Sequence, residues 1–155
     1  MTTPVHGTRL TREYRQNLNA THERVFPLLC PEREKQWLPG WDARWIHSES
    51  GFAEPRAVFA TRHAGAAETI WLVAEHRPAH RVHLVRWHPD RMVVDIELDL
   101  SSPQPNHTWL DVRYTYTATS RAGCTEIEAK TAEQWHAQMK SWEQHLNAWL
   151  ALRRD

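Results

Sequence analysis

Residues 131–152, TAEQWHAQMKSWEQHLNAWLAL, carry the clearest periodicity in the chain. At about 100° per residue, steps of four and three residues keep side chains on one side of a helix. The large apolar residues follow such steps, at Trp135, Met139, Trp142, Leu146 and Trp149. The segment therefore predicts one long C-terminal helix, whose apolar stripe must be covered by another part of the chain.

The start of this helix is less well defined. Thr131 and Gln134 have the spacing of a capping box, which favours a start near residue 131. Residues 125–130 can instead alternate as a strand or continue the helix back towards a start near residue 121. With the earlier start, Glu128 lies near the centre of the stripe and becomes a candidate carboxylate for a pocket beneath the helix.

The covering surface is a predicted antiparallel sheet. Residues 9–19 alternate in polarity and form its first strand. Spacers containing Gly, Pro, Asn and Asp separate the later strands and favour antiparallel neighbours. These six strands are expected near 43–48, 56–63, 68–76, 81–88, 91–100 and 107–118. Apolar residues occupy every second position of the last two, so one face of the sheet is expected to be buried.

Strand 68–76 leaves the orientation of its faces open. Trp71 and Val73 alternate with Ile70, Leu72 and Ala74, and both sets are apolar. Either set can occupy the buried face.

Two short helices are expected after the first strand. Asn19 and Thr21 are both suitable N-caps for the first helix, which Pro27 kinks or shortens. Pro31 suits the first turn of the second, which has Glu32 and Glu34 near its positive end and reaches Trp37. The element order predicts an α+β fold, in which a curved antiparallel sheet of about seven strands wraps around the long C-terminal helix.

Length and composition restrict the class of protein. The 155 residues, 41% of them apolar, are expected to form one domain, 1–155, that needs no disulfide or structural metal. Nineteen basic residues balance nineteen acidic ones, which argues against a nucleic-acid partner. Apolar runs fall far short of the roughly 20 residues that span a membrane. Arg9, Arg12 and Arg15 interrupt the region of a signal peptide, so a cytoplasmic location is expected.

Residues 25–42, VFPLLCPEREKQWLPGWD, resemble the opening of bacterial START-like (SRPBCC) helix-grip proteins. This superfamily includes polyketide cyclase/dehydrase-like and lipid-transfer members. Later segments agree with it over about residues 10–152, namely Glu54 with Val58-Phe59, Thr69-Ile70-Trp71, residues 114–117 and residues 142–150. The resemblance implies a helix-grip fold with a cavity between the sheet, the short helices and the long helix. Such cavities usually take apolar or amphipathic small molecules, and the superfamily shares no single catalytic arrangement.

The nine tryptophans exceed what a core of this size requires, which favours either a lined cavity or an apolar interface. Aromatic walls would supply apolar contact, and tyrosine hydroxyls would orient a carbonyl or phenol. Each candidate also has a structural alternative, as core, as a cap or ion pair, or as a solvated helix flank. The expected ligand-binding residues are Trp37, Trp41, Glu54, Phe59, Tyr114, Tyr116, Trp135, His136, Met139 and Trp142.

Neither a metal nor a cofactor is expected. Four histidines, His76, His80, His83 and His88, gather around one predicted hairpin, but their spacing matches no standard zinc pattern. The five glycines form neither a Walker-A loop nor a dinucleotide fingerprint, and the sequence lacks a Gly-x-Ser-x-Gly elbow.

Three functions remain open. The first is binding of an apolar or aromatic small molecule that is lipid-, polyketide- or hydrophobic-metabolite-like. The second is a cyclase, dehydratase or hydrolase-type enzyme, which needs two of Glu54, His136 and Tyr114 to converge inside the cavity. The third is a co-chaperone-like interaction domain, which an exposed apolar patch and a filled cavity would favour. A homodimer is compatible with all three.

Overall fold

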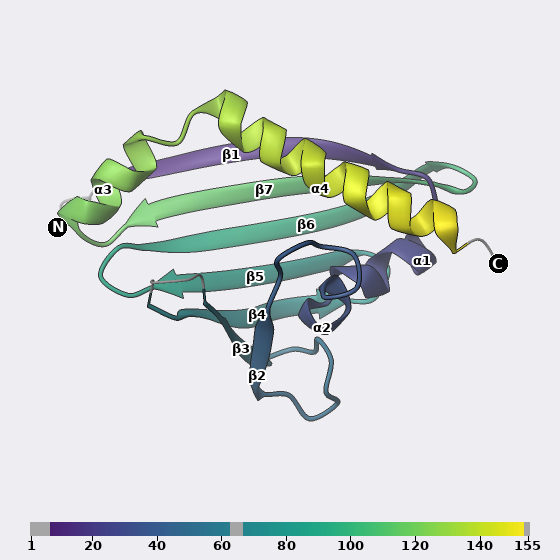
Figure 1. Ribbon diagram of the computed structural model, residues 1–155, viewed down its shortest axis with the longest axis horizontal. Coiled ribbons are helices and arrows are strands. Elements are labelled where there is room, and N and C mark those ends of the chain that lie inside the picture. Colours follow the sequence, from purple (N-terminus) through teal and green to yellow (C-terminus); the bar gives the residue numbers. More distant parts are fainter. Residues whose placement is uncertain (1–6, 63–66, 154–155) are drawn as a thin grey trace, which may run out of the picture.

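The computed structural model describes residues 7–62 and 67–153, and its main element is a seven-stranded antiparallel sheet (Figure 1). The strand order is β1-β7-β6-β5-β4-β3-β2. The strands are β1 (Arg9–Leu18), β2 (Ala43–His47), β3 (Val58–Thr61), β4 (Thr69–Arg77), β5 (Arg81–His88), β6 (Met92–Gln104) and β7 (His107–Ala118). All seven predicted strands are therefore confirmed. His63, at the end of predicted strand 56–63, lies outside the described residues.

The inner face of the sheet follows the predicted alternation. On β6, Val94, Ile96 and Leu98 are buried, and the acidic residues between them are more exposed. On β7, Leu110 and Val112 are buried in the same way. Side chains of a strand point alternately to its two faces, so the apolar set lies beneath the helices.

The orientation of β4, which the sequence left open, is the one with Trp71 and Val73 buried. Leu72 is 41% exposed on the outer face. The Trp71 indole is held inside by a hydrogen bond from its Nε1 to Thr61 Oγ1 of 2.9 Å. A bulge between Val73 and Glu75 shifts the register of β4 against β5 beyond this point.

The predicted pair of short helices follows β1, as α1 (His22–Val25) and α2 (Pro31–Glu34) with a 3₁₀ turn, Phe26–Leu29, between them. Thr21 caps α1, and Pro27 lies in the first turn of the 3₁₀ segment. The prediction that the second helix reaches Trp37 is wrong, because α2 ends at Glu34 and the chain continues in hydrogen-bonded turns. These turns bury the Trp37 indole, whose Nε1 donates to Leu28 O at 2.9 Å.

The C-terminal helical region consists of two helices, α3 (Arg121–Glu128) and α4 (Ala132–Leu152). Ser120 and Thr131 cap them, so both suggested starts exist, but as starts of separate helices. The break between them removes Glu128 from the α4 stripe and leaves it exposed. Glu128 as a pocket carboxylate is therefore wrong.

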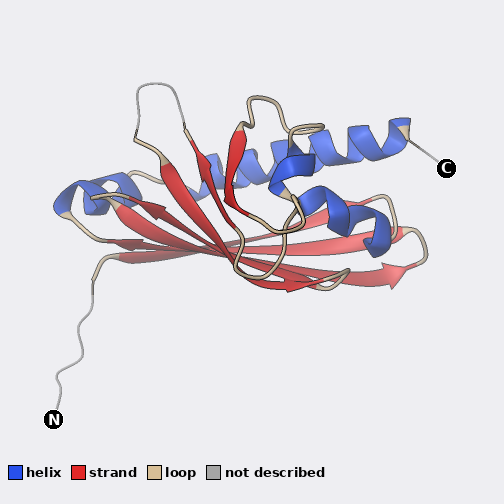
Figure 2. Ribbon diagram, turned by 90° about the horizontal axis from the view of Figure 1, so that it is seen from below, coloured by secondary structure: helices blue, strands red, loops and turns tan. Residues whose placement is uncertain are grey.

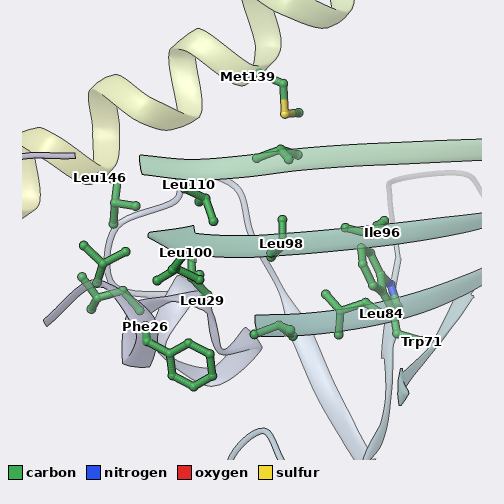
Figure 3. Close-up of a cluster of buried hydrophobic side chains, with 14 of the residues drawn as sticks. Phe26, Leu29, Trp71, Leu84, Ile96, Leu98, Leu100, Leu110, Met139 and Leu146 are labelled. Atoms are coloured by element: carbon green, nitrogen blue, oxygen red, sulfur yellow. The ribbon is translucent and has the colours of Figure 1, made fainter. Parts of the chain in front are cut away.

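The long helix α4 lies across the same face of the sheet as α1 and α2 (Figures 1 and 2). It buries Trp135, Met139, Leu146 and Leu150, while Trp142 is half-buried. Met139 and Leu146 point from the helix towards the apolar residues of β6 and β7 (Figure 3). Within the described ranges, no helix combines the length and apolar character needed to cross a membrane.

The contact between α3 and the turn before β6 gives a test of this packing. A Cβ atom at Gly123 would lie 1.7 Å from the carbonyl oxygen of Arg91. We expect Gly123→Ala to lower the free energy of unfolding by roughly 2–4 kcal/mol, because backbone must move to admit the methyl group. Thr125→Ala, at an exposed position of the same helix, should change it by less than about 0.5 kcal/mol in urea unfolding. Equal stabilities of the two variants would contradict the close approach.

Candidate ligand-binding cavity

A cavity of about 540 Å³ lies between the inner face of the sheet, the α2 region and α4. Its volume is in the range of small-molecule sites, and it opens to solvent. The α2 region contributes Pro31, Glu34, Leu38, Pro39, Gly40 and Trp41; the strands contribute Phe59, Thr61, Trp71, Leu84, Arg86, Ile96, Leu98 and Tyr114; α4 contributes Gln138, Met139, Ser141, Trp142 and His145.

One wall of the cavity is made of ordered aromatic rings. The Trp71 ring stacks on Phe59 with centroids 5.2 Å apart, and Trp41 meets Trp71 edge-on at 5.8 Å. Hydrogen bonds from the indole nitrogens fix both tryptophans, since Trp41 Nε1 donates to Pro31 O at 2.9 Å and Trp71 Nε1 to Thr61. The wall is therefore built before any ligand enters.

The opposite side is formed by α4. The Trp142 ring stacks on Trp37 with centroids 6.1 Å apart and an interplanar angle of 10°. Trp142 Nε1 is buried and has no hydrogen-bond partner among the described residues. This indole therefore brings an apolar surface to the site.

Glu34, at the end of α2, is an acidic group in the cavity lining. Burial raises the pKa of its carboxyl group from 4.5 to about 8. Some of its surface remains accessible, because the cavity opens to solvent. At neutral pH Glu34 is therefore mainly protonated and able to donate a hydrogen bond.

Tyr114 and Arg86 are further polar groups in the lining. Burial is the main cause that raises the pKa of Tyr114 above its ordinary value, and nearby Arg86 opposes the rise. The phenol thus stays protonated at neutral pH. The Arg86 guanidinium lies 5.2 Å from the Trp71 ring centroid and 5.5 Å from that of Tyr114.

The expected binding residues divide between the cavity and the core behind it. Three of them, Trp37, Tyr116 and Trp135, lie outside the cavity lining. Trp37 stacks on Trp142, and Trp135 Nε1 donates to Tyr116 Oη at 3.0 Å. These contacts match the structural alternative for each of the three residues. The cavity lining contains Trp41, Phe59, Tyr114, Met139 and Trp142.

Glu54 and His136 lie outside the cavity lining. The Glu54 carboxylate accepts hydrogen bonds from Ser50 N and Oγ at 2.7 and 2.6 Å and from Ser48 Oγ at 3.1 Å. The bonds from Ser50 are the largest cause that lowers its pKa, to about 2. His136 is exposed on α4, beside Tyr14 and Trp135. Of the three groups proposed for proton transfer, Tyr114 alone faces the cavity.

Glu34, Arg86 and Trp71 are site residues that sequence reasoning did not select. Arg86 could have been selected from the sequence, because Val82, Leu84 and Arg86 occupy alternate positions of one predicted strand. Glu34 was interpreted only as a favourable charge near the start of a helix. Its place in the cavity depends on the path of the chain after α2, for which the local sequence gives no pattern.

The histidines around the β4–β5 hairpin take separate partners. The His76 ring packs on Phe26 at 5.0 Å, whereas His83 Nε2 lies 2.8 Å from Asp95 Oδ2. Among the described residues, no group of three or more His, Cys, Asp or Glu side chains is arranged to hold a metal ion.

Comparisons with known proteins find similarity in structure only. No family model and no curated protein matches the sequence. Norcoclaurine synthase from Thalictrum flavum, in complex with dopamine and hydroxybenzaldehyde, superposes with a TM-score of 0.69 at 8% identity, over 100% of this chain and 97% of that one. A protein from Rhodobacter sphaeroides superposes with a TM-score of 0.63 at 18% identity, over 99% of both chains.

DynU16, from the dynemicin biosynthetic locus, gives a TM-score of 0.63 at 14% identity. The match covers 91% of this chain, which spans about half, 47%, of DynU16. Identities this low show a shared fold and say nothing of activity. Together with the sheet that grips α4, these likenesses show that the chain has the helix-grip fold.

Proposed function

We propose that the cavity binds an apolar small molecule that carries an aromatic ring system. The observation that carries this proposal is the ordered wall of Trp41, Phe59 and Trp71 facing Trp142 across an unfilled space. Removing apolar ligand surface from water would supply most of the affinity. Norcoclaurine synthase, which shares the fold, forms a complex with dopamine and hydroxybenzaldehyde, and both are small aromatic molecules.

Acid–base catalysis in the same cavity is the second candidate function. Glu34 supports it, because a carboxyl group with a pKa of about 8 can both donate and accept a proton near neutral pH. Tyr114 lines the same cavity and stays protonated there. This version of the enzyme hypothesis replaces Glu54 and His136 with Glu34 as the group that moves a proton.

The co-chaperone-like alternative has weaker support. Trp87 and Leu72 are 49% and 41% exposed on the outer face of the sheet, as an interaction surface would require. This alternative also required a filled cavity, whereas the cavity of about 540 Å³ is open.

Trp142→Ala tests the binding proposal. We expect N-phenyl-1-naphthylamine, a neutral fluorescent probe, to bind the wild-type protein saturably. Trp142→Ala should weaken this binding about tenfold, because it removes one apolar wall of the site. Trp87→Ala, which removes an exposed tryptophan outside the cavity, should leave the affinity unchanged. A folded wild-type protein with no saturable binding would contradict the proposal.

Glu34→Gln tests the raised pKa on which acid–base chemistry depends. The unfolded chain loses the Glu34 proton near pH 4.5 and the folded chain near pH 8, so the stability of the wild type falls as pH rises between these values. Glu34→Gln lacks this ionisation. Relative to wild type, it should therefore gain free energy of unfolding from pH 4 to pH 9, on the order of 3 kcal/mol.

Urea unfolding at pH 4, 6, 7.5 and 9 measures this difference. Glu32→Gln is the matched control on α2, where Glu32 forms an ion pair with Lys35 at 3.1 Å. Glu32→Gln should lower the free energy of unfolding by less than about 1 kcal/mol. Relative to wild type, it should not gain stability between pH 4 and pH 9. If the difference between Glu34→Gln and wild type does not change with pH, the acid–base candidate loses its central residue.

A further inference from the structure

Arg86 is a charged residue within an otherwise uncharged row of inner-face side chains. The strand register places Phe59, Trp71, Arg86, Val94 and Tyr116 opposite one another on consecutive strands from β3 to β7. Such positions normally hold apolar side chains, because a charge removed from water costs free energy unless a partner compensates it.

No anion in the described structure compensates this charge. Among the described residues, Arg86 has no hydrogen bond and no ion pair, and its Nε is buried without a partner. Its only ring contacts among the described residues are with Trp71 and Tyr114, and none of its N–H donors forms a hydrogen bond there. Because Arg86 lines the cavity, these donors are available to a ligand.

Glu34 does not neutralise Arg86, although both line the cavity. Burial alone shifts the pKa of Glu34, whereas a nearby guanidinium would oppose that rise. The pKa of Tyr114 is affected by the charges of both Arg86 and Glu34, so both groups lie near its phenol. Near neutral pH Glu34 is mainly uncharged, so the described lining carries a positive charge without a counterion.

A second cation, Lys130, lies close enough to Arg86 for the guanidinium to affect its pKa. The Lys130 ammonium is 5.1 Å from the Tyr116 ring centroid, and its pKa is lowered first by burial and then by Arg86. Arg12 reaches the same region, where its Nη2 donates to Lys130 O at 3.0 Å. Glu126 offsets part of this positive charge, because it raises the pKa of Lys130, and Arg86 is the cation that lines the cavity itself.

We propose that Arg86 binds the carboxylate of an aromatic acid, which makes aromatic carboxylates the ligand class of the cavity. This inference rests on the proposed function and narrows it. A carboxylate matches the planar fork of guanidinium donors and can accept two hydrogen bonds from it. The ring system of the same ligand would then extend along Trp71 towards Trp41 and Trp142.

Two probes that differ in one functional group test the assignment. Naphthalene-2-carboxylate and naphthalene-2-carboxamide share a ring system, and calorimetry at pH 6.5 compares their affinities. The wild-type protein should bind the carboxylate at least tenfold more tightly than the amide. Arg86→Met should abolish this preference, and Arg86→Lys should keep part of it. Arg77→Met, which removes an exposed arginine on β4, should behave as wild type.

The outcomes separate this inference from the proposed function. Equal affinities of the wild type for the two probes overturn the role of Arg86 and leave aromatic binding intact. A folded Arg86→Met protein that keeps the preference overturns it as well. Failure of the wild type to bind either probe overturns both proposals. If Arg86→Met does not fold by circular dichroism, the wild-type comparison, which needs no variant, still decides the outcome.

Discussion

The attachment of α4 along β1 is the constraint on which the rest of the structure depends. Gln16, fully buried on β1, donates from Nε2 to Met139 O at 3.1 Å, and Tyr14 Oη donates to Glu143 Oε1 at 3.0 Å. One turn further on, Asn147 accepts from Asn19 N and donates to Asn17 O, both at 2.9 Å. These bonds hold the helix to an edge strand. Its apolar stripe therefore faces the neighbouring strands, and the space towards β3 and β4 is left to be closed by other elements.

The space between α4 and strands β3 and β4 is filled at one end of the helix and left partly open further along. At one end the short helical segments fill it, and Phe26 and Leu29 meet Leu100, Leu110 and Leu146 in a packed core (Figure 3). Further along, the turn after α2 passes over the sheet without filling it, and Glu34 and Trp41 become wall residues. The cavity thus begins where the packed core ends, and Met139 and Leu98 belong to both.

Most of the fold, and part of the cavity, could be predicted from local patterns. Alternation of polarity located the first strand and the last two, turn residues separated the strands between them, and the spacing of apolar residues located α4. Alternation and helical spacing succeed because both patterns record burial directly. The break between α3 and α4 was not predicted, since Thr131 alone was a cap signal within a sequence able to continue as helix. Glu54 was expected in the cavity from its position before a strand, whereas the structure places it outside the lining, with its carboxylate bound by Ser48 and Ser50 in the β2–β3 loop. Such partners depend on the path of a loop, and residue type does not encode it.

Glu34 and Arg86 contribute differently to the charge of the cavity. Glu34 can escape the cost of a buried charge by keeping its proton, and its raised pKa shows that it does so. Arg86 is the cation of the same lining, and no anion among the described residues compensates it. An ionised Glu34 would compete with a ligand carboxylate for Arg86 or repel it. With Glu34 neutral, the positive charge of Arg86 remains unmatched, and the cavity combines an aromatic wall with an attraction for anions.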